Sequence, residues 1–515
     1  MSHARASLSS RWFLGVLLFA AAFWMLDLVW LGAGVPHPLD DTWEDAVVAR
    51  LLLQGDWFRS HAIYPPLWGL RDPQTLTVPV LVHGPLLPLL LAAPIRIFGP
   101  AVADSIAWLA ALFALLTLIP LFRLTARLFG EPVAAAAAGL FTVSPLTIAA
   151  VNHYGSVVLG ALLLTATLDL LARPRPRAGL AGLAAGLGYL VRPEMLIAAP
   201  VLALLAAGPR PDRRAARDFL LVFAACASWW WWHHWKTSGS PFFNLTSYLL
   251  VSFWPPHPGD GLVRDFGVTP ERFRGILAES LPGLWHKWLH FFPRAARRAL
   301  LTPGESTGWL VPIGALVALG RAELRRFALC AAALALIPVA AMTALVAIWL
   351  YPVPFLPLYC VAAALGAKWL LERLPRWAHR PRAWIGLLAL AALPAAGVQL
   401  RAQADEARMI GRWLALDRAG LAAAVRTEEN ATRPMFSDTP DFVAWTTGRP
   451  TLWLTREEFD RLYGLGGARN PLPEGLPARP DPADTWFHRG NPRDPAGQRG
   501  APIGAEAGRP GTPSR

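Results

Sequence analysis

The chain has 515 residues, of which 54% are hydrophobic and only 16% are charged. Long uncharged segments recur through the first four-fifths of the sequence, which argues against a water-soluble protein and indicates several membrane-spanning helices. The formal net charge of +13 could indicate nucleic-acid binding, but the arginines cluster in short loops between apolar segments, as the positive-inside rule requires. We therefore expect a polytopic membrane protein.

The first apolar segment, residues 12–31, follows a short basic N-terminus. A cleaved signal peptide is the alternative to a retained helix. The apolar run is long for a signal peptide, and no clean small-x-small cleavage site precedes Asp40. We expect a retained first span with its N-terminus in the cytoplasm.

Eleven segments approach the ~20-residue length of a helix that crosses a bilayer. They are residues 11–33, 103–122, 132–150, 153–171, 178–192, 194–208, 217–236, 305–320, 326–348, 350–371 and 383–400. If they alternate in direction, the arginine-rich loops all fall on one side, which is then cytoplasmic. The expected fold is an all-α polytopic membrane protein with about eleven spans.

Residues 84–99 form a further apolar stretch that would disturb this alternation if it were a full span. The stretch is short and contains three prolines. It therefore predicts a re-entrant or interfacial helix, which is tolerated at membrane depth where protein buries it.

Three regions then lie on the exterior side of the membrane. They are the first loop, residues 34–83, the second loop, residues 237–304, and the whole segment after residue 400. Residues 1–400 form the expected transmembrane domain.

The segment after residue 400 differs in composition from the spans. Apolar residues at helical spacing predict an amphipathic helix over residues 402–424, and a helix with acidic residues in its first turn begins at Thr455. Three strand-like runs lie between them, around Met435, around Val443 and at residues 452–454. We expect a small exterior α/β domain over residues 401–464 and a disordered tail rich in Pro, Gly and Arg over residues 465–515.

An acidic stretch opens the first exterior loop, just beyond the first span. Its carboxylates belong to Asp40, Asp41, Glu44 and Asp45. Ionised groups beside a hydrocarbon phase are costly unless they face water or take part in chemistry. Neighbouring carboxylates in a partly dry cleft raise one another's pKa toward the range that suits a general base. These four residues are therefore candidate functional groups.

A structural interpretation of Asp41 is compatible with this one. Glu44 follows Asp41 at the third position, which is the pattern of a helix N-cap, and the predicted helix runs to about Gln54 before Gly55 ends it. A capping residue occupies a fixed place and keeps a free carboxylate oxygen.

His83 begins the predicted re-entrant segment near the exterior surface. An imidazole there can carry a proton or contact a phosphate. The alternative is an ordinary exposed loop histidine.

Arg192 and Glu194 interrupt an apolar stretch, YLVRPE, at the predicted exterior face. They can form a buried ion pair that stabilises the bundle. Alternatively, the guanidinium group of Arg192 can recognise a phosphate, whose geometry it matches.

The run WWWWHHWK, followed by GSPFFN, ends another predicted span. Tryptophans at a span end typically form an interfacial belt. His233, His234 and Lys236 could meet an anionic lipid headgroup there. Adjacent histidines lack the spacing of helical metal ligands, so we predict no His-only metal site.

Four segments of the chain together resemble the GT-C superfamily of integral-membrane glycosyltransferases. They are DDTWEDAVVARLLLQGDW after a first span, HGPLLPLLLA ending in FG, YLVRPE and GSPFFN. Within it, the chain is similar to the dolichyl-phosphate-mannose protein mannosyltransferase and aminoarabinose transferase group. The C-terminal SDTPDFVAWTTGRPTLWLT also resembles the exterior domain of bacterial members.

The resemblance implies an inverting transfer of a sugar from a polyprenyl-phosphate donor, an EC 2.4 reaction. It places Asp41 at the position of the family's acidic residue, beside Asp40, so we expect both to be catalytic. The remaining expected site residues bind substrate. They are Glu44, Asp45, His83, Arg192, Glu194, His233, His234 and Lys236. The family often has Lys before its PPL-type motif, whereas this chain has His83 and Gly84.

The resemblance further implies a bacterial plasma-membrane protein whose C-terminus is exterior, with membrane lipids and a lipid, glycan or protein acceptor as partners. No cofactor is predicted with certainty, and a divalent cation is the one candidate. A multi-pass transporter or flippase for a lipid-linked substrate is the alternative function. It would be expected to show internal repeats or midplane charges, whereas the charges here gather at one face.

Overall fold

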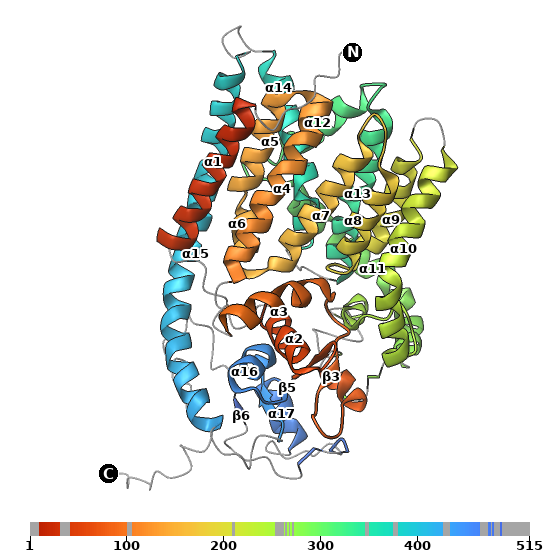
Figure 1. Cartoon of the computed structure of the whole chain (residues 1–515), viewed down its shortest axis with the longest axis vertical. Helices are drawn as coiled ribbons and strands as arrows, with labels where there is room; N and C mark the ends of the chain where they lie inside the picture. The colour runs from red at the N-terminus through yellow and green to blue at the C-terminus, as the bar shows by residue number, and fades with distance from the viewer. Residues whose placement is uncertain are drawn as a thin grey trace.

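The computed structural model describes residues 10–30, 42–99, 106–208, 212–252, 262, 265–266, 268–269, 272–345, 350–373, 380–425, 433–463, 472–474, 476–477 and 485–486. They form an upper bundle of helices and a smaller lower layer of short helices and strands (Figure 1). We call these the helical bundle and the lower layer.

The helices of the bundle follow one another along most of the chain. They are α1 (Arg11–Met25), which continues as a π-helical turn (Leu26–Trp30), α4 (Ile106–Phe129), α5 (Glu131–Val143), α6 (Pro145–His153), α7 (Gly155–Leu171), α8 (Ala178–Tyr189), α9 (Glu194–Ala206), α10 (Arg213–Ser238), α11 (Phe273–Leu300), α12 (Leu310–Leu319), α13 (Arg325–Leu345), α14 (Leu356–Leu371) after a 3₁₀ turn (Val353–Phe355), and α15 (Pro381–Val425). Every predicted span coincides with one of these helices, or with the pair α5 and α6.

Within the described residues, five helices are long and apolar enough to cross a membrane. A sixth is added if α5 and α6, which meet at a bend of 53°, count as one span. Several other helices of the bundle are apolar but shorter, such as α8 and α9. The helices support a polytopic membrane protein, and the count of about eleven spans stays a prediction.

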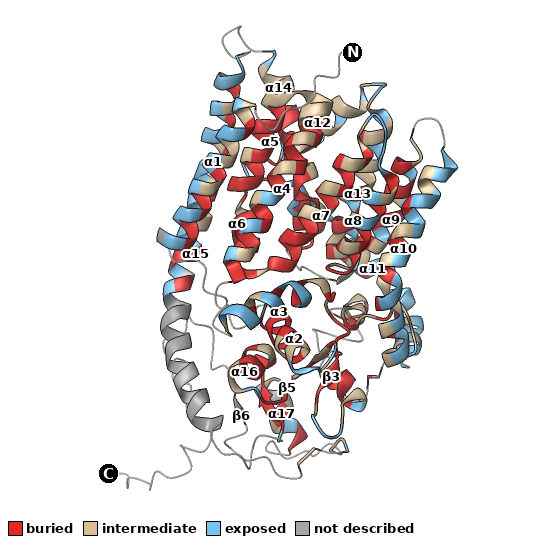
Figure 2. Ribbon diagram, in the orientation of Figure 1, coloured by how far each residue is buried: buried red, intermediate tan, exposed pale blue. Residues whose placement is uncertain are grey.

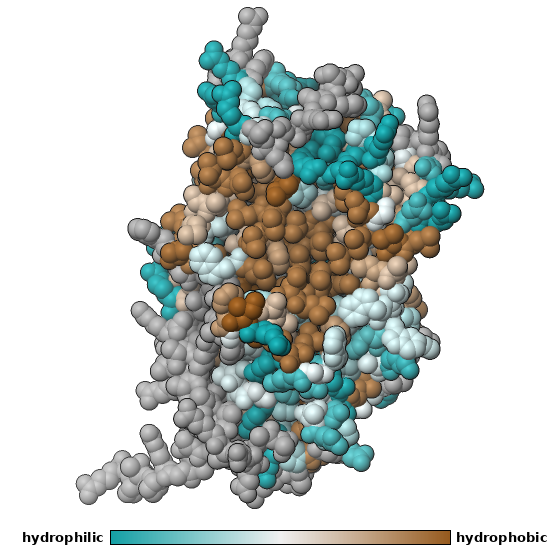
Figure 3. Space-filling view, in the orientation of Figure 1, coloured by the Kyte–Doolittle hydropathy of each residue, from teal (hydrophilic) through white to brown (hydrophobic). Residues whose placement is uncertain are grey.

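The surface of the bundle supports the same conclusion. A broad hydrophobic band covers its middle, with hydrophilic residues above and below (Figure 3). Large apolar side chains of the bundle helices are exposed, including Leu204 of α9, Leu316 of α12 and Leu390 of α15. Large exposed apolar surface of this kind marks a face that meets lipid.

The lower layer is built from the first loop and the end of the chain. It contains α2 (Thr42–Gln54), β1 (Arg59–Ser60), β2 (Ala62–Ile63), a 3₁₀ helix (Pro65–Leu70), β3 (Val78–Pro79), α3 (Leu86–Phe98), β4 (Met435–Ser437), α16 (Pro440–Thr447), β5 (Thr451–Trp453), α17 (Arg456–Leu462) and β6 (Thr485–Trp486). A further 3₁₀ helix, Leu245–Leu250, comes from the second loop.

One sheet joins the two ends of the chain. Its strand order is β2-β5-β4-β6, and every pairing is parallel. Ala62 lies opposite Thr451 and Ile63 opposite Leu452, so a strand of the first loop completes the C-terminal sheet. The strand β6 comes from the segment predicted as a disordered tail, most of which lies outside the described residues.

The local predictions for these elements mostly agree with the structure. Helix α2 ends at Gln54, and Gly55 follows with a φ of 99°, which favours glycine. Helix α17 begins with a capping box between Thr455 and Glu458. Helix α3 occupies the predicted re-entrant stretch and lies across the lower end of the bundle beside α2 (Figure 1).

The strand predicted around Val443 is wrong, because this run forms α16. Pro440 stands at the first helical turn and Asp441 follows it, and both favour a helix start. Phe442, Val443 and Trp445 are buried against the rest of the lower layer, so the run gains its burial as a helix (Figure 2).

Candidate functional site

The acidic stretch is described only in part. Asp40 and Asp41 lie outside the described residues, so their predicted catalytic roles and the predicted cap are not located. Glu44 and Asp45 stand in the first turn of α2 and are buried, with exposed fractions of 2% and 3%. Buried carboxylates require partners, and the neighbours of Glu44 define a site.

Glu44 lies between two ring side chains of the lower layer. Its Oε2 atom is 3.1 Å from Nε2 of His83 and accepts a hydrogen bond of 3.3 Å from the hydroxyl of Tyr64. The first pair is an ion pair whenever the imidazole is protonated. His83 is thus not an isolated loop residue but a neighbour of the acidic helix.

The glycine after His83 brings a second predicted motif to the site. A Cβ atom on Gly84 would clash with the backbone carbonyl of Leu190 and lie 2.9 Å from the amide nitrogen of Val191. The amide of Leu86 donates a 3.0 Å hydrogen bond to the same Leu190 carbonyl. Only glycine allows this approach, so the segment that carries His83 packs directly against the segment that carries Arg192.

Arg192 forms a buried ion pair with Glu194, with 2.8 Å between Nη2 and Oε1. Its guanidinium carbon also lies 5.6 Å from the ring centroid of Tyr351. This geometry supports the structural interpretation of the pair. The phosphate-binding role of Arg192 stays a prediction.

The histidines of α10 face inward. His233 stacks on Trp230 with 4.6 Å between ring centroids, and the ring of Phe58 packs beside both. Nδ1 of the buried His234 hydrogen-bonds the backbone oxygen of Phe243. These contacts hold the end of α10 against the first loop.

The GSPFFN segment closes the same region from the second loop. Asn244 donates a 2.8 Å hydrogen bond from its side-chain amide to the carbonyl of Val82, next to His83. The amide of Leu245 bonds the carbonyl of Leu81 at 2.9 Å. Segments 80–87, 189–194 and 233–245 therefore converge beside α2.

Among the predicted site residues of α10, Lys236 is the one whose side chain points away from the site. Its Nζ atom lies 4.9 Å from the ring centroid of Trp232, which is exposed. Trp232 and Lys236 are one helical turn apart, on a different face from Trp230 and His234. This placement is typical of an interfacial belt.

Arg50 was not among the site residues predicted from the sequence. It donates two hydrogen bonds of 2.8 Å, to the carbonyls of Ala444 and Trp445, and its guanidinium carbon lies 4.9 Å from the Trp445 ring centroid. Trp43, at the start of α2, packs edge-on against Phe442 at 5.5 Å. Helix α16 of the C-terminal segment therefore packs against the acidic helix α2.

Two buried polar pairs at the lower end of the bundle were also missed. Asn152 donates a 3.1 Å hydrogen bond to Asp27, and His153 lies 2.6 Å from the side-chain oxygen of Gln403. All four residues are buried. A carboxylate inside the first apolar segment was the sequence signal that could have marked Asp27.

Within the described residues, no group of three or more His, Cys, Asp or Glu side chains could hold a metal ion. Asp40 and Asp41 lie outside the described residues, so the predicted divalent cation stays a prediction.

Comparison with protein families gives one match. Residues 82–232 match the family described as dolichyl-phosphate-mannose-protein mannosyltransferase. The match includes His83, Arg192 and the tryptophans at positions 229–232 of α10. No curated protein matches the chain in sequence.

Two solved membrane proteins share the architecture. The apo structure of ArnT from Cupriavidus metallidurans aligns with a TM-score of 0.58 and 13% identity over 90% of each chain. The oligosaccharyltransferase of Archaeoglobus fulgidus aligns with a TM-score of 0.56 and 16% identity over 86% of this chain, which spans 62% of that longer protein. The resemblance inferred from the sequence motifs is confirmed, and the chain has the fold of the polytopic GT-C membrane glycosyltransferases.

Proposed function

We propose that the protein is an inverting glycosyltransferase. It moves a sugar from a polyprenyl-phosphate donor to an acceptor hydroxyl on a lipid, glycan or protein, at the exterior face of a bacterial plasma membrane. Support comes from the mannosyltransferase family match and from the bound lipids of two similar structures. One structure of ArnT contains undecaprenyl phosphate and aligns with this chain at a TM-score of 0.51. One structure of the archaeal oligosaccharyltransferase contains a dolichol-phosphate and aligns at a TM-score of 0.55.

The observation that carries the proposal is the contact between Glu44 and His83. It joins the acidic helix that follows Asp41 to the segment that packs against Arg192. The Glu44 carboxylate and the His83 imidazole thus meet in the lower layer, and the His83 segment packs on the backbone that leads into Arg192. A transfer from a lipid phosphate needs a base for the acceptor and positive charge for the leaving group.

In this mechanism, Asp41 accepts the proton of the acceptor hydroxyl while the hydroxyl oxygen attacks the anomeric carbon. The bond between that carbon and the phosphate oxygen breaks, and its electron pair leaves with the polyprenyl phosphate. The attack comes from the opposite face, so the configuration inverts. Asp40 is the neighbouring carboxylate that raises the basicity of Asp41.

The leaving phosphate gains negative charge as the bond breaks. Protonated His83 and Arg192 would stabilise it, with Lys236 at the membrane surface. Glu44 and Glu194 orient these two cations through the ion pairs at 3.1 and 2.8 Å. The proposed substrate-binding set is completed by Asp45, His233 and His234. The two histidines act by fixing the end of α10.

The test uses the purified full chain in lipid nanodiscs with labelled polyprenyl-phosphate sugars, with and without a chelator. The Asp41→Asn variant is expected to express normally and to lose transfer by at least ~100-fold, the scale of a lost general base. Asp72→Asn, at an exposed turn of the first loop, is the matched control. Near-normal turnover of the Asp41 variant would remove Asp41 from the mechanism, and donor that remains intact with every acceptor would refute the glycosyltransferase assignment.

The bend between α5 and α6 favours one alternative, a transporter or flippase for a lipid-linked substrate. Broken helices of this kind often surround transport sites. The same nanodisc assay separates the two functions, because a flippase moves the donor across the bilayer without consuming it.

A further inference from the structure

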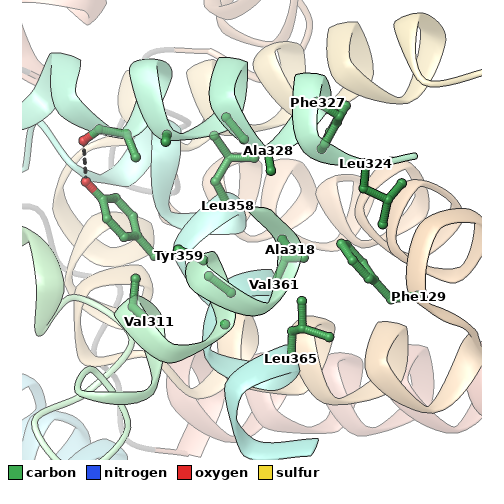
Figure 4. Close-up of a pocket in the computed structure, with 16 residues that line it drawn as sticks. Phe129, Val311, Ala318, Leu324, Phe327, Ala328, Leu358, Tyr359, Val361 and Leu365 are labelled. Carbon is green, nitrogen blue, oxygen red and sulfur yellow. Dashed lines mark hydrogen bonds between the residues drawn. The ribbon is translucent and has the colours of Figure 1, made fainter. Parts of the chain in front are cut away.

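An apolar cavity lies far from the candidate site. It has a volume of about 100 Å³ and lies between α12, α13 and α14 (Figure 4). Phe129, the last residue of α4, forms one wall. The 24-residue helix α4 is ~36 Å long, so its end is a bilayer's depth away from the lower layer.

Small side chains explain why the cavity exists. On α12 and α14, Gly314 and Gly366 let the two backbones touch, since a Cβ atom on Gly314 would clash with the Ala362 carbonyl. Besides Phe327, the facing side of α13 carries alanines along the cavity, including Ala328 and Ala332. Methyl groups are too short to fill the space that remains beside the α12–α14 pair.

The cavity is apolar throughout. Of its 16 lining residues, Tyr359 alone carries a side-chain polar group, and its hydroxyl donates a 2.6 Å hydrogen bond to the Ala335 carbonyl. Figure 4 shows this bond at the edge of the cavity. With that hydroxyl engaged, the lining offers no partner for a sugar or a phosphate, and a water molecule there would lack hydrogen bonds. A hydrocarbon chain fits this chemistry.

The rim of the cavity is basic. The turn between α12 and α13 carries Arg321 and Glu323, and α13 begins with Arg325 and Arg326, which gives a net charge of +2. The Arg321 guanidinium lies 5.9 Å from the ring centroid of Phe129, the cavity wall. A cationic group is thus fixed where a chain leaving the cavity would carry its headgroup.

We propose that the cavity holds part of one acyl chain of an anionic phospholipid, whose phosphate binds at Arg321. The apolar lining selects the chain, and the basic turn selects the charge of the headgroup. This lipid is distinct from the proposed donor, whose phosphate would bind beside the lower layer at the opposite end of the bundle (Figure 1). The inference therefore does not depend on the proposed function.

The test is a titration of the delipidated full chain with phosphatidylglycerol, phosphatidylethanolamine of matched chains and a polyprenyl phosphate, followed by native mass spectrometry. Phosphatidylglycerol is expected to bind at least ~10-fold more tightly than phosphatidylethanolamine. Ala332→Trp fills the cavity and should abolish this binding, whereas Leu316→Trp, at a position of α12 that is 70% exposed, should not.

The surface variant Arg321→Gln keeps the proposal testable if the tryptophan variant fails to fold. It should bind phosphatidylglycerol no better than phosphatidylethanolamine while still binding one lipid. Equal affinity for the two phospholipids in the wild type, unchanged binding by Ala332→Trp, or displacement of phosphatidylglycerol by equimolar polyprenyl phosphate would each overturn the proposal.

Discussion

Arg50 and Trp445 are joined both through the backbone and through the ring. One guanidinium nitrogen of Arg50 donates to the Trp445 carbonyl at 2.8 Å, while the guanidinium carbon lies 4.9 Å from the centroid of the Trp445 ring. The two residues are 395 positions apart in the sequence. The pair ties the acidic helix α2 to the C-terminal helix α16.

Arg50→Gln should therefore weaken transfer without touching the reacting groups. The carbonyls of Ala444 and Trp445 lose their donors, at a cost of ~1–3 kcal/mol, and α2 is no longer held in place. We expect the kcat to fall more than ~10-fold with little change in KM, because orientation rather than donor binding is lost. Steady-state kinetics in nanodiscs measure both constants.

Arg217→Gln is the control for Arg50, since Arg217 is exposed and pairs only with its neighbour Asp218 among the described contacts. It should leave kcat unchanged. Equal rates for Arg50→Gln and the wild type would show that the C-terminal contact does not position α2.

His83→Ala should leave the buried Glu44 carboxylate without its imidazole neighbour. Tyr64 supplies a neutral hydrogen bond, which does not replace an opposite charge. We expect transfer to fall by ~10²-fold and His83→Lys, which restores a cation, to recover part of it. His286→Ala, on the exposed face of α11, is the control; a transfer rate that His83→Ala leaves unchanged would contradict the role of His83.

Gly84→Ala should destabilise the contact between the His83 and Arg192 segments. The added methyl group would collide with backbone atoms of Leu190 and Val191, which cannot rotate away. Overpacking of this kind costs ~1–3 kcal/mol, and the thermal midpoint should fall measurably. Gly15→Ala, where a Cβ atom meets nothing within 4 Å, is the matched control and should not lower the midpoint, because alanine favours the interior of helix α1.

His61 gives the lower layer a pH dependence. Burial, and to a lesser extent the charge of Arg50, lowers the pKa of His61 to about 4 from its ordinary 6.5. Between these values the unfolded state binds the proton and the folded state does not, so stability falls as the pH drops from 6.5 to 4, by up to ~3 kcal/mol. Above pH 6.5 the residue has no effect.

Thermal midpoints at pH 7.5 and 4.5 test this prediction for the wild type and His61→Asn. The wild type should lose more stability than the variant over this interval. Parallel losses would show that His61 does not titrate with a lowered pKa.

The sequence predicted the helices well because their signal is local. Hydropathy and length placed a helix at every proposed span, and the Thr455 capping box and the Gly55 stop were readable from a few residues. The site required long-range information. Neither the Glu44–His83 contact nor the hydrogen bond from Arg50 to Trp445 produces a periodic pattern in the sequence.

The same reasoning explains the error at Val443. A short apolar run can form a strand or a buried helix, and the tertiary contact with α2 decided for a helix. Resemblance, rather than pattern, identified Asp41.

The parallel pairing of β2 with β5 constrains biosynthesis. Ala62 emerges early from the ribosome, but its partner Thr451 is made almost 400 residues later. During that time the edge of β2 remains without its native neighbour while the intervening helices insert into the bilayer. A product truncated before β5 can therefore contain most of the bundle helices yet lack the strand that pairs with β2 in the lower layer.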